Sequence, residues 1–339
     1  MRILLIQPDK LGDSILCLPA LHHLRVSKPD ARITMLTRKT NFPLYAGTGL
    51  VDELIDCPPA PSLKYALRCL ATARIGYDAA ICFPRAGARR WLGMAHLCGA
   101  KLTIGAPYQR GSLRGNRNID RCVAMPDIVH DSDRAKRLVS VLTGEPSGPL
   151  MYKVAVDLEG AAELLQRNGV LTPYLVVHVN TGGSDPAYPL DKWMQVARGL
   201  GDESGLQVVL SGGQDAPIPD LPHPRITNLV GKSTLAQLTG LVASAQAVVS
   251  GSTAAVHLAS AMGTGVVLVE SIPKTDAAYV QFLPYNVPLR HLLVGGDNIT
   301  PAPEEIVAAA LDLLSTGGFK TPFEGLLPPF SERPLPMRF

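Results

Sequence analysis

The chain opens with Arg2-Ile-Leu-Leu-Ile-Gln7, then Pro8-Asp-Lys-Leu-Gly-Asp13, then Ser14-Ile-Leu-Cys-Leu-Pro-Ala-Leu-His-His-Leu24. The first six residues form a short apolar run of the kind found in buried strands, and turn formers follow it. From Ile15 onward, apolar residues recur at helical spacing. The stretch therefore predicts a strand, a loop and a helix, in that order.

Gly12 and Asp13 stand where the predicted strand has ended and the helix begins. In open α/β sheets ligands bind beyond the carboxyl ends of the strands, so a carboxylate in this place can reach a substrate. Asp and Ser are also favoured caps of helix N-termini, which would give Asp13 or Ser14 a purely structural role. The stretch alone leaves both interpretations open.

The same alternation of strands and helical segments runs along the whole chain. Further strand-like segments cover residues 32–37, 51–56, 77–84 and 100–105 in the first half, and 174–180, 207–213, 226–231, 247–252 and 265–270 in the second. This alternation is typical of doubly wound parallel sheets. We expect an α/β protein with two Rossmann-like domains, residues 1–156 and 157–316, facing a central cleft, followed by a Pro-rich extended tail over 317–339.

Composition supports two globular domains and argues against some functions. The chain has 339 residues, of which 46% are hydrophobic and 18% charged, values typical of a globular protein rather than a disordered one. The net charge of +3 is too small to indicate a nucleic-acid-binding protein. We therefore expect no nucleic-acid partner.

Basic residues crowd one part of the first half. They are Arg85, Arg89, Arg90, Lys101, Arg110, Arg114, Arg117 and Arg121. Such a stretch can bind an anionic partner, for example a phosphorylated glycan or an anionic membrane surface, or it can be an ordinary solvated surface. The first three follow the strand predicted to end near Pro84, on the side of the expected cleft.

The expected location is the cytoplasm. Asp9, Lys10 and Asp13 interrupt the first apolar run, so it does not resemble a secretory signal, and no apolar segment is long enough to span a bilayer. The six cysteines have no close spacing of a zinc or redox motif. Any membrane contact is therefore expected to be peripheral, at the inner face.

The second half contains Gly251-Ser-Thr-Ala-Ala-Val-His257, where a predicted strand ends and a helix begins. Small residues let a ligand approach the backbone, and helix N-termini bind phosphate through free N–H groups. His257 would lie about one turn into the helix and could face the same anion. A small-residue helix packed on the sheet, with a structural histidine, explains the pattern equally well.

Two other strand ends open into glycines, Asn180-Thr-Gly-Gly183 and Ser211-Gly-Gly-Gln-Asp215. Glycines here suit an anion-binding nest or a tight turn. Gly231-Lys-Ser-Thr234 ends like a phosphate-binding loop, but Ile226 occupies the place of the leading glycine, so a capped helix start explains it better. The sequence shows neither a metal-ligand cluster nor a nucleophile elbow.

Together, several motifs resemble glycosyltransferase family 9, the ADP-heptose:lipopolysaccharide heptosyltransferases. They are Leu11-Gly-Asp13, Leu18-Pro-Ala-Leu21, Tyr77-Asp-Ala-Ala-Ile81, Asn180-Thr-Gly-Gly183, Ser252-Thr-Ala-Ala-Val-His-Leu-Ala259 and Ile299-Thr-Pro-Ala-Pro-Glu-Glu-Ile306. The resemblance implies a GT-B fold, with the sugar-nucleotide donor, for example ADP-heptose, held by the second domain and a glycan or lipopolysaccharide-type acceptor held by the first. It also implies inversion at the anomeric carbon without a metal or other cofactor.

The resemblance assigns roles to individual residues. Asp13 matches the family's proposed general base, and Thr181, Thr253 and His257 match donor-binding positions. An inverting transfer needs such a base on the acceptor hydroxyl and stabilisation of the departing diphosphate. Further candidates are Gly182, Gly212, Gln214, Ser252, Ala254 and Lys274 for the donor, and Gly12, Arg85, Arg89 and Arg90 for the acceptor.

The chain also departs from the family pattern. Ser252 replaces an acidic residue that typically contacts the donor sugar, and Pro186 replaces a phosphate-binding lysine. These changes suggest a different donor, a relocated cation such as Lys274, or lost catalysis. The alternatives to a transferase are a non-hydrolysing sugar-nucleotide epimerase and a non-catalytic glycan-binding protein.

Overall fold

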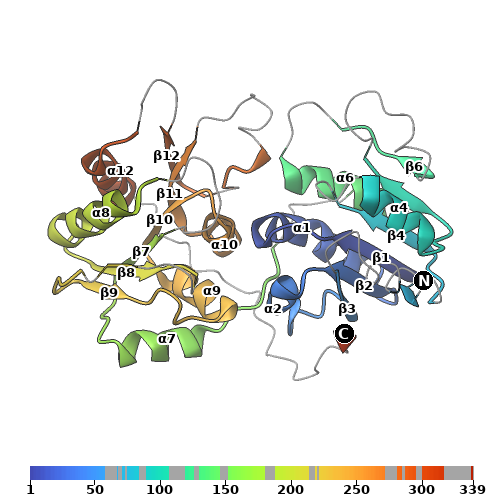
Figure 1. The fold of residues 1–339 in the computed structure, drawn as a ribbon, viewed down its shortest axis with the longest axis horizontal. Helices are drawn as coiled ribbons and strands as arrows, with labels where there is room; N and C mark the ends of the chain where they lie inside the picture. Colours follow the sequence, from blue (N-terminus) through green and yellow to red (C-terminus); the bar gives the residue numbers. More distant parts are fainter. Residues whose placement is uncertain are drawn as a thin grey trace. The chain divides into compact units, whose positions relative to one another are not determined.

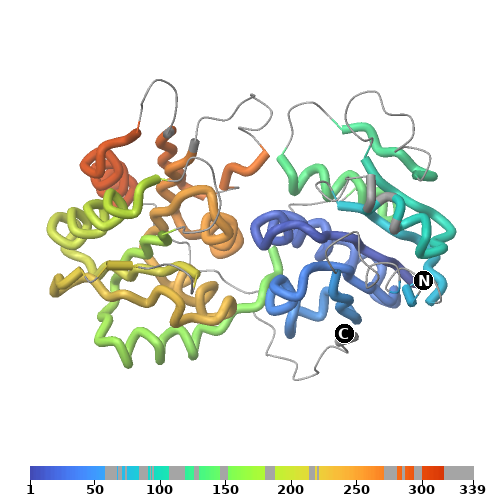
Figure 2. Tube along the Cα trace, viewed as in Figure 1, coloured from blue at the N-terminus to red at the C-terminus, as the bar shows by residue number. Residues whose placement is uncertain are grey.

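The structure is a computed structural model that describes residues 1–57, 67, 71–72, 75–83, 89–106, 119–125, 130–145, 152–179, 188–213, 218–219, 221–271, 281–284, 287–294, 300–316 and 337–338. The chain divides into two compact units, Met1–Ala155 with Leu327–Phe339, and Val156–Leu326. Each unit is built on one parallel sheet (Figure 1), and Figure 2 traces the chain through both. Among the described helices, none has the length and apolarity needed to cross a membrane.

The first unit has a seven-stranded sheet in the order β13-β3-β2-β1-β4-β5-β6. Its strands are β1 (Arg2–Gln7), β2 (Arg32–Thr37), β3 (Glu53–Asp56), β4 (Ala79–Cys82), β5 (Thr103–Gly105), β6 (Arg121–Cys122) and β13 (Met337–Arg338). Its helices are α1 (Leu11–Ser27), the 3-10 helix η1 (Lys39–Asn41), α2 (Phe42–Tyr45), α4 (Arg89–Leu97) and α6 (Asp131–Thr143).

β1 is the central strand of this sheet because it is apolar on both faces. Leu4 and Ile6 pack in one cluster with Trp91 and Ala95 of α4, and α1 packs against α6. All residues of β1 after Arg2 are buried. A strand covered by helices on both faces reads as a continuous apolar run rather than an alternating one, as the sequence of β1 does.

The second unit has a six-stranded sheet in the order β12-β11-β10-β7-β8-β9. Its strands are β7 (Tyr174–His178), β8 (Gln207–Ser211), β9 (Ile226–Asn228), β10 (Ala247–Gly251), β11 (Gly265–Ser271) and β12 (Leu289–Val294). Its helices are α7 (Leu158–Arg167), α8 (Leu190–Glu203), α9 (Leu235–Ser244), α10 (Ala254–Met262) and α12 (Pro303–Ser315). Figure 1 shows α8 and α12 on one face of this sheet and α9 and α10 on the other.

The predicted α/β class and the two doubly wound parallel sheets are confirmed. In each unit the first strand is central, and the chain adds two strands on one side before it crosses to the other. The helix-cap interpretation of Gly231-Lys-Ser-Thr234 is also confirmed. Thr234 Oγ1 accepts a hydrogen bond from Gln237 N at 3.2 Å, and Gln237 Oε1 accepts one from Thr234 N at 3.0 Å. This reciprocal pair is a capping box that starts α9.

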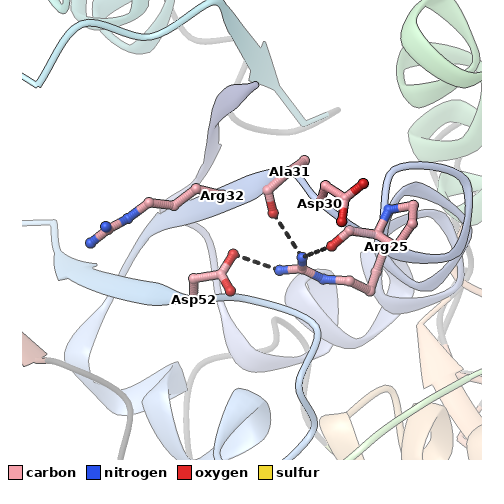
Figure 3. Close-up of a pocket in the computed structure, with 6 residues that line it drawn as sticks. Arg25, Asp30, Ala31, Arg32 and Asp52 are labelled. Carbon is pink, nitrogen blue, oxygen red and sulfur yellow. Dashed lines mark hydrogen bonds and ion pairs between the residues drawn. The ribbon is translucent and has the colours of Figure 1, made fainter.

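A pocket of about 310 Å³ lies at the edge of the first sheet where β2 and β3 begin (Figure 3). Arg25 lines this pocket. Its Nη2 is 2.6 Å from Asp52 Oδ2, and its Nη1 is 2.8 Å from the carbonyl oxygen of Ala31. The same Asp52 oxygen accepts a hydrogen bond from Ile33 N at 2.6 Å. Arg25 and Asp52 therefore join α1 to the starts of β2 and β3, which is a structural role.

Replacing Asp52 with alanine should destabilise the first unit. The change removes one ion pair and one backbone hydrogen bond, and we expect the free energy of unfolding to fall by about 1–2 kcal/mol after allowance for the partial exposure of the pair. Chemical denaturation measures this loss. Asp30→Ala is the matched control, since Asp30 lines the same pocket but is exposed. Equal effects of the two variants would contradict the structural role.

Candidate functional site

The strand orders locate one candidate site in each unit. In each sheet the chain adds strands first on one side of its first strand and then on the other. This change of side falls between β1 and β4 in the first sheet and between β7 and β10 in the second. Beyond the carboxyl ends of such strands the loops diverge to opposite faces, and ligands of doubly wound proteins bind there. Asp13 follows β1, and Ser252 to His257 follow β10, so the predicted residues occur at these two places.

In the first unit, Asp13 is the third residue of α1 rather than part of a loop. The sequence predicted a helix from Ile15, but α1 begins at Leu11, so Gly12 and Asp13 lie in its first turn. The reason is that Asp13 caps the helix from inside, with its Oδ2 accepting a hydrogen bond from Lys10 N at 3.2 Å. This helix-capping contact is compatible with a second role for the carboxylate.

Buried polar side chains fix the turn between β1 and α1. Gln7 Oε1 accepts a hydrogen bond from Asp9 N at 2.8 Å. Asn41 Nδ2 donates to the carbonyl oxygen of Asp9 at 3.0 Å and to Ser14 Oγ at 2.9 Å. Gln7 and Asn41 are each 1% exposed. Because they restrict the backbone on both sides of Asp13, its carboxylate has a defined position before any ligand binds.

The cysteines near this turn are not nucleophiles. Burial raises the pKa of Cys17 well above its usual value, and the charges of Asp131, Asp13 and Asp9 raise it further. Burial likewise raises the pKa of Cys82. Both thiols therefore stay protonated near neutral pH.

In the second unit, the strand register aligns three polar side chains at the carboxyl edge. Ser211 pairs with His178, and His178 pairs with Ser250. His178 Nδ1 lies 2.9 Å from Ser211 Oγ, and Ser250 Oγ donates to the carbonyl oxygen of His178 at 3.2 Å. Burial lowers the pKa of His178 from 6.5 to about 4, so its ring is neutral at physiological pH.

The same network continues into the start of α10. Ser250 Oγ lies 3.0 Å from Thr253 Oγ1, which accepts a hydrogen bond from Ala255 N at 3.2 Å. Thr253 is thus the N-cap of α10. Ser252 is exposed, and Thr253 and Ala254 are half-buried, so the first turn of this nine-residue helix is accessible. Such a turn suits a phosphate group.

His257 and Gly212 lie near this turn in more enclosed surroundings. His257 is one turn into α10, as the sequence predicted, and is 5% exposed. A Cβ atom on Gly212 would lie 2.8 Å from the carbonyl oxygen of Val179, so a side chain would push the ends of β7 and β8 apart. Gly212 therefore has a packing role at this edge, whatever it contributes to a ligand.

The remaining predicted residues are placed only in part. Arg89 and Arg90 begin α4, which follows the carboxyl end of β4, and only their backbone is described. Five lie outside the described residues, namely Arg85, Thr181, Gly182, Gln214 and Lys274. Within the part of the chain that is described, no group of His, Cys, Asp and Glu side chains could hold a metal ion.

Comparison with known proteins identifies the family. A family model described as glycosyltransferase family 9 (heptosyltransferase) matches residues 93–269. A glycosyl transferase family 9 structure from Veillonella parvula superposes with a TM-score of 0.76 at 18% identity, over 93% of this chain and 97% of that chain. The ADP-heptose LPS heptosyltransferase II of E. coli gives a TM-score of 0.72 at 19% identity, over 93% and 99%. E. coli heptosyltransferase WaaC with ADP gives 0.67 at 19% identity, over 94% and 100%.

A search of curated proteins found no match. At 18–19% identity, the solved structures establish the fold, which is the GT-B type that the resemblance implied. The family model spans just over half of the 339 residues and includes the α10 turn. The chain belongs to glycosyltransferase family 9.

Proposed function

We propose that the protein is an inverting glycosyltransferase. It moves a sugar, heptose or a related one, from a nucleotide-diphosphate donor to a hydroxyl group of a glycan or lipopolysaccharide-type acceptor. The observation that carries this proposal is the carboxylate of Asp13, held by Lys10 N beyond the carboxyl end of β1 in a member of this family. The ADP and ADP-heptose named for the E. coli relatives make ADP-heptose the first donor to test.

Asp13 is the general base of the proposed reaction. It removes the proton of the acceptor hydroxyl while the hydroxyl oxygen attacks the anomeric carbon from the face opposite the nucleotide, which inverts the configuration. Its place in the first turn of α1 suits an acidic residue, because a helix N-terminus carries partial positive charge. The hydrogen bonds that Gln7 accepts and Asn41 donates keep the turn between β1 and α1 in one conformation.

The second unit binds the donor. The departing diphosphate gains negative charge, and the N–H groups at the start of α10, with the hydroxyls of Ser252 and Thr253, stabilise it. His257 completes this site one turn further on. Thr181, Gly182, Gly212, Gln214, Ala254 and Lys274 are further donor-binding candidates. Catalysis by these groups needs no metal ion.

The first unit binds the acceptor. α4 begins just after the carboxyl end of β4, the strand beside β1, so Arg89 and Arg90 occupy the same edge as Asp13. With Gly12 and Arg85 they are candidates for contact with acceptor phosphates. A lipid-linked acceptor would bring the protein to the inner face of the membrane without insertion.

Replacing Asp13 with asparagine should abolish transfer but keep the fold. The amide oxygen can still accept the hydrogen bond of Lys10 N, but it cannot take a proton, so we expect turnover to fall about 100-fold to 10,000-fold. Asp78→Asn is the control, because Asp78 also accepts a backbone hydrogen bond, from Arg2 N at 2.9 Å, at the amino edge of the same sheet. Loss of donor binding together with turnover in Asp13→Asn would instead indicate a structural aspartate.

A thermal-shift screen with ADP, UDP, GDP and dTDP sugars tests the donor assignment. A donor at 100 times its Kd should stabilise the protein by about 2.7 kcal/mol. The stabilising donor is then incubated with and without a lipopolysaccharide-core acceptor. Conversion of the donor without acceptor would favour a non-hydrolysing epimerase, and binding without turnover would favour a non-catalytic glycan-binding protein.

The pH dependence of stability tests the neutral His178 at the donor edge. Its folded pKa of about 4 lies below its ordinary value of 6.5, so the unfolded chain binds more protons between these values. Stability should therefore fall as the pH drops from 6.5 to 4, by up to about 3 kcal/mol from this residue. In His178→Gln this slope should shrink, as measured by denaturation at each pH. An unchanged slope would contradict the burial of a neutral ring.

A further inference from the structure

A histidine and a carboxylate with little exposure contact each other at the carboxyl end of β11. His291 Nε2 of β12 is 2.9 Å from Glu270 Oε1 of β11, and the two side chains are 11% and 13% exposed. The proposed function does not use either residue, and neither belongs to the family motifs in the sequence. Two strands that pack side by side do not require such a pair, since apolar side chains would join them at lower desolvation cost.

The register of β10 and β11 places Glu270 beside the β10–α10 turn. Gly251, the last residue of β10, pairs with Val269. Glu270 is the next residue of β11, so it lies alongside Ser252 at the neighbouring strand end. Adjacent strands are about 4.8 Å apart. Glu270 is therefore one strand spacing from the turn proposed to bind the diphosphate.

Glu270 also belongs to the face of the sheet that carries the hydroxyl network. Ser250 pairs with Leu268, and side chains two residues apart on a strand lie on the same face, so Glu270 shares the face of Ser250. α10 covers this face and contacts both β10 and β11 (Figure 1). The carboxylate, the hydroxyls and the start of α10 thus occupy one corner of the second unit.

The charge of Glu270 determines what it can bind in this corner. A carboxylate repels phosphate, but it accepts strong hydrogen bonds from hydroxyl groups. It has about four lone-pair positions, and one contact with His291 leaves capacity for further donors. In a nucleotide sugar, the sugar is bonded directly to the diphosphate. A group one strand away from the phosphate-binding turn is therefore placed for the sugar.

We propose that Glu270 binds hydroxyl groups of the donor's sugar and that His291 positions its carboxylate. This inference rests on the proposed function, because it takes the start of α10 as the diphosphate site. Glu270 then selects for a hydroxylated sugar, while α10 binds the nucleotide diphosphate irrespective of the sugar. The two parts of the donor are recognised by neighbouring strand ends.

Thermal-shift titration of the whole protein tests this division, with ADP, ADP-heptose, UDP and UDP-glucose as probes. In the wild type we expect at least one sugar nucleotide to bind more tightly than its free nucleotide diphosphate. In Glu270→Gln we expect the affinity for that sugar nucleotide to fall about 10-fold to 100-fold, because a charged acceptor is lost. The affinity for the free nucleotide diphosphate should stay unchanged. His291→Gln should give a smaller loss with the same selectivity.

Asp312→Asn is the matched control. Asp312 is a carboxylate paired with the β12 residue before His291, with its Oδ2 2.5 Å from Arg290 Nε, and it belongs to α12 on the opposite face of the sheet. This variant should bind all four probes like the wild type. Unchanged sugar-nucleotide affinity in Glu270→Gln, or equal losses for the sugar nucleotide and the free diphosphate, would overturn the inference.

The two proposals fail at different steps of this experiment. A wild type that binds none of these four probes, and none of the GDP and dTDP sugars of the wider screen, fails the proposed function before any variant is compared, and the inference falls with it. A wild type that binds nucleotide diphosphates without any gain from the sugar overturns the role of Glu270 and leaves nucleotide binding by the second unit in place.

Discussion

Parallel strand pairing is the constraint on which both candidate sites depend. Every described strand pair in the two sheets is parallel, so all the strands of a sheet end at the same edge. In each sheet the first strand is central and the chain later crosses to its other side. The loops that follow the two strands at this crossing therefore diverge to opposite faces of the sheet. Ser211, His178 and Ser250 are separated by tens of residues in the sequence, and the register alone makes them neighbours. The chemistry of each unit therefore follows from how its strands are ordered.

Buried polar groups give these edges their rigidity. An unpaired polar group inside a protein costs about 1–3 kcal/mol, so a buried amide or hydroxyl stabilises the one loop conformation that satisfies it. Asn41 does this for the Asp13 turn, and Ser250 does it for the α10 turn, where its hydroxyl is near both the His178 carbonyl and the Thr253 hydroxyl. The more accessible residues of each turn therefore take their positions from side chains that are themselves buried.

The sequence predicted the features that depend on local pattern. Strands, helices and the α/β class follow from periodicity over a few residues, and Asp13 and the α10 turn follow from short motifs at strand ends. The start of α1 was placed four residues late because Asp13 caps it from the third position instead of preceding it. Asn41, His178 and Glu270 gave no signal, because their importance comes from strand register and tertiary contact, which no local pattern records.

The charges at the donor edge favour a further cation, for which Lys274 is the candidate. The start of α10 supplies about half a unit of positive charge, whereas a departing diphosphate carries more than one negative charge. His178 is neutral near pH 7, and Glu270 adds negative charge one strand away. A further cation would therefore add to the stabilisation of the departing diphosphate in the proposed transfer. In the sequence, Lys274 follows the end of β11 by three residues, and β11 is the strand next to the α10 turn.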